Sequence, residues 1–231
     1  MEGQCLGGRF EVEREVGRGG VGVVYRARDL DTGRTVALKV VAAEAGMAPE
    51  EEARLMSEGR VLQELDHPGI VKVISSGVLP DTSQPYLAME WLASEDTSTP
   101  LTPVPLTLGG PAEITMHVAR AFAAAHAAGV VHRDIKPGNI FLVAAKGEAQ
   151  TTFGAQPKLV DFGVAKSDDM RVTQAGDIVG TPAYMSPEQA RGDAAVDARS
   201  DIYSLGATLF ELITRRPPHV GPSHIATLAR L

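Results

Sequence analysis

The sequence predicts an α+β protein in which a small antiparallel sheet with one main helix precedes a larger and mostly helical part. Apolar residues alternate with glutamates over Phe10–Val16, which is the period of a half-buried strand. A glycine-rich turn then leads into two more β-rich runs, Val24–Asp29 and Thr35–Val41, with no helix between them. Later in the chain, apolar residues recur at helical spacing in two segments, Pro111–Gly129 and Asp197–Thr214.

The composition is that of a globular protein and excludes several classes of partner. The chain has 231 residues, of which 44% are hydrophobic and 22% charged, enough for one large domain or two lobes. Its net charge of −7 argues against nucleic acid or an anionic membrane as the main partner. The single cysteine, Cys5, suits a reducing compartment. Since no apolar run reaches the ~18 residues of a spanning helix, we expect a cytoplasmic protein, tethered to a membrane only through sequence beyond Leu231.

The first motif is the G-x-G-x-x-G pattern formed by Gly17, Gly19 and Gly22. This pattern marks dinucleotide-binding folds as well as other phosphate sites, but a dinucleotide fingerprint opens a helix. Here the chain continues as a strand and then turns at residues 31–33. Glycine lets backbone N–H groups approach a phosphate without a Cβ in the way. We therefore interpret the segment as a phosphate-binding hairpin, and a glycine-rich turn without a ligand is the alternative.

The third strand carries Lys39 among apolar residues, and a buried ammonium group is costly without a partner. A helix is predicted over Glu50–Leu65, and Glu58 lies among its apolar positions. Glu58 is thus one candidate partner of Lys39 in this helix, and Glu51, Glu52 and Glu64 are the alternatives. Gly59 in the same helix costs about 1 kcal/mol relative to alanine, and the sequence offers no reason for it.

Further strands and one insertion complete the outline of the chain. Two predicted strands, Ile70–Gly77 and Tyr86–Trp91, bring the small sheet to five strands. A polar insertion at Ala144–Gln156 is interpreted as an extended loop, and the strand Lys158–Val160 follows it.

The two long helices are expected to build the core of the larger part. His117 and His126 on the first of them are interpreted as packing residues. The helix Asp197–Thr214 is apolar nearly all round, which predicts that it is buried.

The segment Val130–Phe141 places polar side chains among apolar ones at spacings that fit neither a helix nor an alternating strand. A carboxylate, an ammonium group and an amide so close together can orient a hydroxyl, neutralise a phosphate and bind a metal. For any one of these residues, a polar turn between two core segments is the alternative. The polar residues are His132, Arg133, Asp134, Lys136 and Asn139.

The sequence HRDIKPGN at residues 132–139 resembles the catalytic loop of eukaryotic-type (Hanks-type) protein kinases, and Lys136 resembles the serine/threonine branch. Other family motifs occur in the family's order: the glycine loop, VALK ending at Lys39, DFG beginning at Asp161, and GTPAYMSPE ending at Glu188. The resemblance, to bacterial members, implies a bilobal protein-kinase fold. It implies an N-terminal tail at residues 1–8, a small lobe and hinge at 9–92, and a large lobe at 93–231 that lacks the family's last helices.

This resemblance also implies an ATP-dependent protein kinase that phosphorylates serine and threonine hydroxyls of proteins. Asp134 would orient and deprotonate the hydroxyl, Lys136 would screen charge on the transferred phosphoryl group, and Lys39 would hold phosphates and pair with Glu58. The metal ligands would be Asn139 and Asp161, with Mg²⁺ the expected ion and Mn²⁺ the alternative. The implied ATP-binding residues are Val16, Gly17, Gly19, Gly22, Val24, Ala37, Lys39, Met89, Glu90, Leu92, Asp96 and Phe141.

Regulation and support of the loop follow from the same resemblance. Arg133 would bind a phosphate on Thr173, placed there by autophosphorylation, for which a homodimer is possible. Thr181 would bond Asp134 and Lys136 and position the substrate. Asp201 would cap the backbone of the catalytic loop, and Glu188 would lack the arginine with which it pairs in the family.

Two other functions compete with this interpretation. A nucleotide-binding pseudokinase scaffold is disfavoured because all the charged catalytic residues are present. A small-molecule kinase of related fold is disfavoured by the GTPAYMSPE segment, which positions peptides in protein kinases. ATP and protein substrates are the expected partners.

Overall fold

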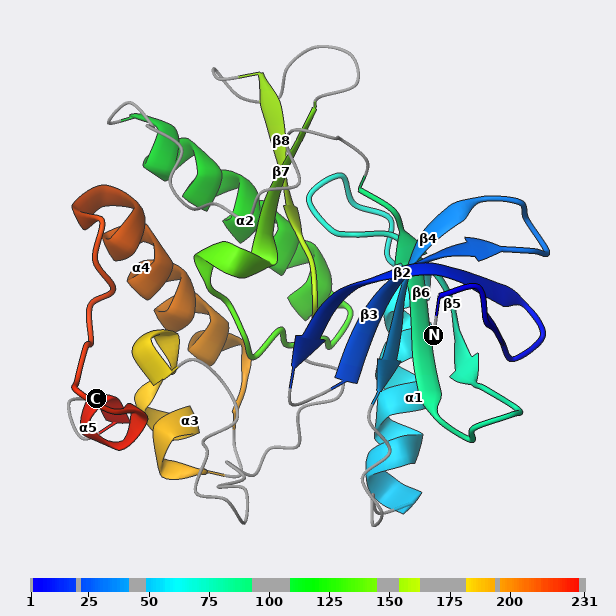
Figure 1. Ribbon diagram of the computed structural model, residues 1–231. Coiled ribbons are helices and arrows are strands. Elements are labelled where there is room, and N and C mark those ends of the chain that lie inside the picture. The colour runs from blue at the N-terminus through cyan, green and yellow to red at the C-terminus, as the bar shows by residue number, and fades with distance from the viewer. Residues whose placement is uncertain are drawn as a thin grey trace. The chain divides into compact units, whose positions relative to one another are not determined.

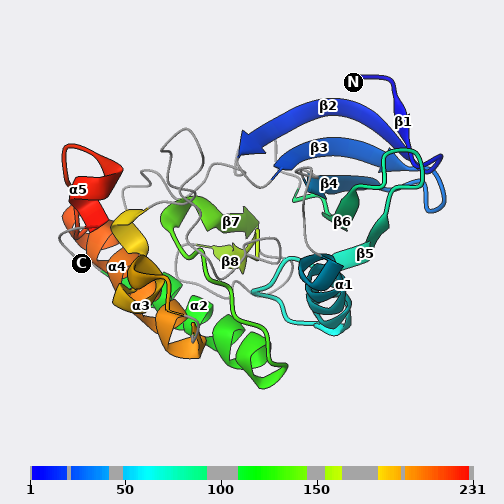
Figure 2. The same ribbon diagram turned by 90° about the horizontal axis from the view of Figure 1, so that it is seen from below.

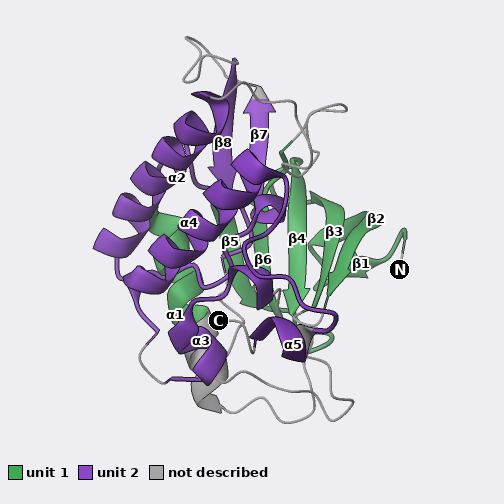
Figure 3. Cartoon of the chain, turned by 90° about the vertical axis from the view of Figure 1, so that its left-hand side faces the viewer, with its two compact units in different colours: residues 1–66, 71–92 green, residues 67–70, 93–231 purple. Residues whose placement is uncertain are grey.

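The computed structural model describes residues 2–19, 22–41, 49–92, 109–144, 154–162, 182–193 and 196–228. The chain divides into two compact units, which are coloured separately in Figure 3. The first unit comprises Met1–Asp66 and Val71–Leu92, and the second comprises His67–Ile70 and Ala93–Leu231. We describe each unit by itself.

The first unit contains an antiparallel sheet of six strands in the order β1-β2-β3-β4-β6-β5 (Figure 1). The strands are β1 (Cys5–Leu6), β2 (Phe10–Gly19), β3 (Gly22–Asp29), β4 (Thr35–Val41), β5 (Val73–Val78) and β6 (Pro85–Glu90).

The short strand β1 was missed by the prediction of five strands and a free tail at residues 1–8. It pairs with β2, and backbone bonds join Gly3 N–H to Val12 O and Val12 N–H to Gln4 O, each 2.9 Å long. Leu6 is buried in the core of the sheet. Two residues are too few to show an alternating pattern, so only the paired structure identifies this strand.

One face of the sheet encloses the apolar core of the unit. Phe10 packs edge-on against Tyr86, with ring centroids 5.1 Å apart. At the margin, Arg9 donates two 2.8 Å hydrogen bonds to the fully buried Asp29. These bonds, with a smaller contribution from Thr32, lower the pKa of Asp29 to about 2 although burial opposes the shift. The buried core residues are Leu6, Phe10, Val12, Tyr25, Ala27, Val36, Leu38, Val40, Leu79 and Ala88.

The helix α1 (Pro49–Glu64) lies beside β5 and β6 (Figure 2). Gly59 stands where the helix meets the sheet: a Cβ at this position would be 3.2 Å from both Ser76 Cβ and Leu87 Cδ2. That is shorter than ordinary van der Waals contact. Close packing of helix on sheet therefore explains the glycine that the sequence left without a reason.

The second unit contains four helices and a two-stranded sheet within its described residues (Figure 1). The two longest helices, α2 and α4, pack against each other, and α2 also contacts β8. The elements are α2 (Gly109–Ala127), β7 (Ile140–Ala144), β8 (Ala155–Leu159), α3 (Pro187–Arg191), α4 (Ala198–Thr214) and α5 (His224–Leu228).

The helix α4 is buried on one face only, which corrects the expectation of a fully buried helix. Leu205 and Leu212 are each 6% exposed, whereas Ile202 is 54% and Ile213 56% exposed. Periodicity could not separate the two faces because apolar residues occupy both. None of the helices that the structure describes is long and apolar enough to cross a membrane.

Candidate active site

The catalytic-loop residues form one hydrogen-bonded cluster in the second unit. The chain leaves α2, turns at Gly129, whose φ is +78°, and reaches a 3₁₀ turn at Pro137–Asn139 just before β7. Lys136 Nζ lies 3.1 Å from Asp134 Oδ2. Asn139 Nδ2 donates to the Asp134 backbone carbonyl at 2.7 Å and to Asp134 Oδ2 at 3.2 Å. Of the three polar residues predicted to act together, Lys136 and Asn139 therefore both contact the carboxylate of the third, Asp134.

The buried side chain of His132 supports this cluster through hydrogen bonds. Its side chain is fully buried, and the ring lies 4.5 Å from the ring of Phe162. Because the carbonyl of Val160, 3.1 Å away, can only accept a hydrogen bond, Nε2 carries the proton and Nδ1 is left to accept from Asp134 N–H at 3.4 Å. Burial lowers the pKa of His132, although nearby carboxylates, Asp201 first, oppose the shift. His132 is thus a neutral bridge between the catalytic loop and the chain before Asp161.

Asp201 holds the backbone of the loop, as expected. Its buried carboxylate accepts from His132 N–H at Oδ2 and from Arg133 N–H at Oδ1, both at 2.8 Å. His126 Nε2 lies 2.8 Å from Oδ2, and the His126 ring stacks on Phe122. His126 is thus a structural residue with a polar contact as well as a packing contact.

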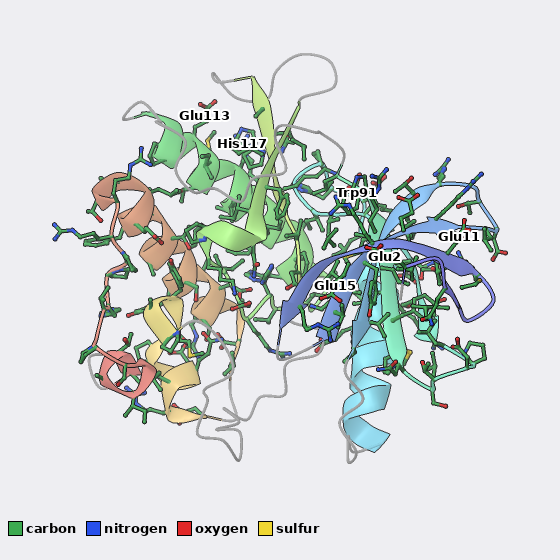
Figure 4. All side chains as sticks on the ribbon, viewed as in Figure 1. Glu2, Glu11, Glu15, Trp91, Glu113 and His117 are labelled. Carbon is green, nitrogen blue, oxygen red and sulfur yellow. The ribbon has the colours of Figure 1, made fainter. Side chains whose placement is uncertain are left out.

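The other histidine of α2 does behave as a packing residue. His117 is 7% exposed and lies on α2 (Figure 4). Nothing in the spacing of the sequence distinguishes the two histidines, because the difference depends on which of them faces Asp201 on α4.

Asn139 and the residue before Asp161 are joined by a backbone hydrogen bond, so the two predicted metal ligands lie on linked segments. The Nδ2 group of Asn139 donates a hydrogen bond to the backbone carbonyl of Asp134. The Oδ1 atom of Asn139, an oxygen of the kind that Mg²⁺ prefers as a ligand, therefore points away from that carbonyl. Val160 N–H donates to the Asn139 carbonyl at 3.0 Å, so the residue next to Asp161 is tied to Asn139. Asp161 adopts a φ of +62°, an uncommon conformation for a residue other than glycine. The donor set fits a hard cation.

The chain that begins at Pro182 is anchored on α4. Ser204 Oγ donates to the Tyr184 carbonyl at 2.7 Å, and the Tyr184 hydroxyl donates to Glu211. Burial, followed by this hydrogen bond, raises the pKa of Tyr184.

Glu188 has a partner on α4, because the Ser200 hydroxyl donates to its carboxylate. Partial burial tends to raise the pKa of Glu188, but the hydrogen bonds it accepts, from Ser200 first, lower it overall. Glu188 therefore has a neutral hydrogen-bond donor, Ser200, beside its carboxylate, and the expected lack of its family arginine stays a prediction.

In the first unit, the register of the sheet puts Lys39 and Val24, two of the predicted nucleotide residues, on a common face. Paired residues of neighbouring antiparallel strands point to the same side, and Lys39 pairs with both Val24 and Leu87. Leu87 also contacts the site of Gly59, so α1 covers the face that carries Lys39. Lys39 is 7% exposed. The pairing of Lys39 with Glu58 stays a prediction.

The remaining predicted contacts of the first unit are consistent with a nucleotide but do not require one. A Cβ on Gly17 or Gly19 would meet no described atom within 4 Å, so packing among the described residues does not call for glycine there. Gly22 has a φ of +149° and pairs with Gly19 at the end of the hairpin. The N–H of Glu90 donates to the Lys72 carbonyl at 2.9 Å, so a contact between Glu90 and ATP cannot use that N–H.

The other predicted ATP residues lie on the strands and just beyond them. Val16 is 38% exposed at an irregularity of β2, and Ala37 on β4 pairs with the buried Met89 on β6. Leu92 follows β6, and Phe141 lies on β7 in the second unit. Three predicted residues, Asp96, Thr173 and Thr181, lie outside the described part of the chain.

Comparison with known proteins identifies the family. The sequence model described as the protein kinase domain matches residues 10–229. A probable serine/threonine-protein kinase of Streptomyces coelicolor is 40% identical over 231 residues, covering 97% of this chain and 33% of that protein. PknB of Mycobacterium tuberculosis is 37% identical over 227 residues, covering 96% of this chain and 35% of PknB. The chain thus spans about a third of the length of the curated relatives it matches.

Solved structures agree with this identification. The crystal structure of the PknI kinase domain of Mycobacterium tuberculosis matches with a TM-score of 0.71 at 27% identity, covering 96% of this chain and 80% of that one. Members of this family use ATP and a divalent metal and act on proteins. The chain belongs to the protein kinase family, in its bacterial Hanks-type branch.

Proposed function

We propose that this chain is the catalytic part of an ATP-dependent serine/threonine-protein kinase that transfers the γ-phosphate to protein hydroxyls. The observation that carries the proposal is the arrangement around Asp134. Its carboxylate is contacted by Lys136 and Asn139 and is 12% exposed. A carboxylate that is held in place yet still reachable is what a base for a hydroxyl proton requires.

Each residue of the cluster has a role that follows from its chemistry. Asp134 orients the attacking hydroxyl and accepts its proton, while Lys136 places positive charge where the transferred phosphoryl group carries negative charge. Because the transition state is loose, most of the rate comes from such positioning and electrostatics. Asn139 and Asp161 would hold Mg²⁺, which supplies charge against the phosphate oxygens. Lys39, paired with Glu58, would hold the other phosphates.

The proposal extends to regulation. A phosphate on Thr173 would add about −1.5 to −2 charges, and the guanidinium of Arg133, next to Asp134 in the chain, is suited to bind it. Thr181 would remain a substrate-positioning residue. Autophosphorylation between two copies of the chain would supply the phosphate, and ATP and protein substrates would be met in the cytoplasm.

Replacement of Asp134 by asparagine tests the catalytic assignment. The variant should bind ATP normally, because the change removes only the proton acceptor and its charge. Its kcat for phosphate transfer to a generic protein substrate should fall by about 10²-fold or more. The matched control is Asp66→Asn, at an exposed position before the second unit, which should keep wild-type kcat.

Two results would contradict the proposal. If Asp134→Asn keeps more than about a tenth of wild-type kcat, Asp134 is not the base. If the wild-type chain binds ATP and magnesium but transfers no phosphate, a pseudokinase scaffold is the better description.

A further inference from the structure

The residue just before Asp134 is held on both sides of its backbone. Arg133 has a φ of +64°, a left-handed conformation that residues with a Cβ rarely adopt. Its N–H donates to Asp201 Oδ1 at 2.8 Å, and its carbonyl accepts from Gln189 Nε2 at 2.9 Å. Such a conformation persists only where the surroundings hold it in place. Two side chains, one from α4 and one from α3, therefore determine the direction in which the chain enters Asp134.

Gln189 also has a structural task in its own helix. Ser186 is the N-cap of α3, and its side chain accepts from Gln189 N–H at 3.3 Å. Gln189 Oε1 accepts in return from Ser186 N–H at 3.1 Å and from Ser186 Oγ at 3.2 Å. Serine followed three residues later by glutamine is the sequence signature of this capping box.

The two ends of the Gln189 amide therefore do different work. The oxygen serves the helix cap, where a glutamate would serve equally well, since glutamate and glutamine are both usual at this position of a capping box. The nitrogen serves the catalytic loop, and a carboxylate has no N–H to donate to a carbonyl. Because both partners of Oε1 are donors and the partner of Nε2 is an acceptor, the orientation of the amide is determined by its neighbours.

We propose that Gln189 is a positioning residue for phosphate transfer: it holds the Arg133 carbonyl, and so fixes Asp134 relative to Lys136 and Asn139. The inference rests on the proposed kinase function. It also makes α3, which begins within the GTPAYMSPE motif, a direct support of the catalytic loop. Displacement of α3 would release the Arg133 carbonyl and loosen Asp134 without touching any residue of the catalytic cluster.

Two substitutions separate the role of Gln189 in the cap from its role in the loop. Gln189→Glu keeps the capping box but loses the donor to Arg133, so kcat should fall about fivefold or more while the KM for ATP stays near wild type. The lost hydrogen bond should also lower the melting temperature by a few degrees. Ser186→Ala removes the serine hydroxyl from the cap but leaves the Gln189–Arg133 bond. It should lower the melting temperature by a few degrees, in line with a lost N-cap of about 1 kcal/mol, with kcat close to wild type.

Hydrogen exchange gives a readout that does not depend on activity. Peptides covering residues 130–141 should exchange faster in Gln189→Glu than in wild type and should be unchanged in Ser186→Ala. If the glutamate variant does not fold, Gln189→Met, which lacks both the donor and the acceptor, takes its place and should show the same loss of kcat and the same faster exchange.

The outcomes distinguish this inference from the proposed function. A folded Gln189 variant with wild-type kcat and wild-type exchange in the catalytic loop overturns the positioning role. An equal loss of kcat in Ser186→Ala and Gln189→Glu also overturns it, because the cap would then be the cause. A wild-type chain that transfers no phosphate overturns the proposed function, while the exchange comparison still decides whether Gln189 holds the loop.

Discussion

Asp201→Asn is the most informative single substitution, because one carboxylate receives three donors from two other segments. Oδ2 accepts from His132 N–H and is 2.8 Å from His126 Nε2, and Oδ1 accepts from Arg133 N–H. Asparagine keeps one oxygen and presents an NH₂ group in place of the other. In its best orientation the oxygen takes the place of Oδ2, and the NH₂ group then faces the N–H of Arg133.

The cost can be worked out from these contacts. A hydrogen bond to a charged group is worth about 1.5–3 kcal/mol, and a buried donor left unsatisfied costs about 1–3 kcal/mol. The two bonds that remain also weaken when the carboxylate loses its charge. We expect the free energy of unfolding to fall by about 2–4 kcal/mol, a large share of the 5–15 kcal/mol typical of a domain. Because the lost bond is that of Arg133, kcat should fall as well.

Urea unfolding followed by far-UV circular dichroism measures the stability, and a phosphate-transfer assay measures kcat. The matched control is Asp197→Asn at the N-cap of the same helix, where the side chain accepts from Arg199 N–H at 2.9 Å. Asparagine and aspartate cap equally well, so this variant should lie within about 0.5 kcal/mol of wild type. An Asp201→Asn variant that is also within about 0.5 kcal/mol, with kcat within twofold, would refute the reasoning.

Three further predictions concern stability. Asp29→Asn should cost about 2 kcal/mol at neutral pH, because its pKa is lowered from 3.8 to about 2 in the folded state. This contribution to the free energy of unfolding is fully present above pH about 4 and is lost as the pH falls toward 2. If the difference in stability between the variant and wild type, measured by urea unfolding, is as large at low pH as at neutral pH, this explanation is wrong. Gly59→Val should destabilise the protein by about 1–3 kcal/mol through overpacking, whereas Gly206→Ala, at an open site on α4, should stabilise it by about 0.5–1 kcal/mol. If thermal melts show that Gly59→Val is the more stable variant, overpacking is not the explanation. Leu212→Ala should cost about 2–5 kcal/mol and Ile213→Ala under about 0.5 kcal/mol, since the two side chains are 6% and 56% exposed; equal losses would mean that the exposed face of α4 is covered in solution.

Local patterns were enough for most of the fold. Period-2 alternation and the glycine loop predicted the hairpin of β2 and β3, and β4 spans Thr35–Val41 as predicted. The helix predicted over Glu50–Leu65 differs from α1 by one residue at each end. These elements could be predicted because their signals lie within a few neighbouring residues. The two-residue strand β1 carries no such signal and is defined only by its pairing with β2.

The sequence by itself determined the chemistry of the candidate site. Asp134, Lys136 and Asn139 lie within six residues of one another, so their side chains could be expected to meet whatever the rest of the chain does. The structure brings them into contact. Asp201 could be predicted as a support of the loop only through the resemblance to the kinase family.

Only the tertiary structure decided which distant residues hold that chemistry in place. Gln189 and Arg133 are 56 positions apart, and His126 and Asp201 are 75 positions apart. The capping-box signature at Ser186 and Gln189 could be seen in the sequence, but it indicates a helix start and says nothing of a second partner. Similarly, the low helix propensity of Gly59 is a local property, while the 3.2 Å approach to Ser76 that favours a glycine there is not. Contacts of this kind depend on how α1 packs on its sheet and on how α2, α3 and α4 pack around the catalytic loop. The periodicity of a single segment does not predict this packing, because the packing involves residues far apart in the sequence.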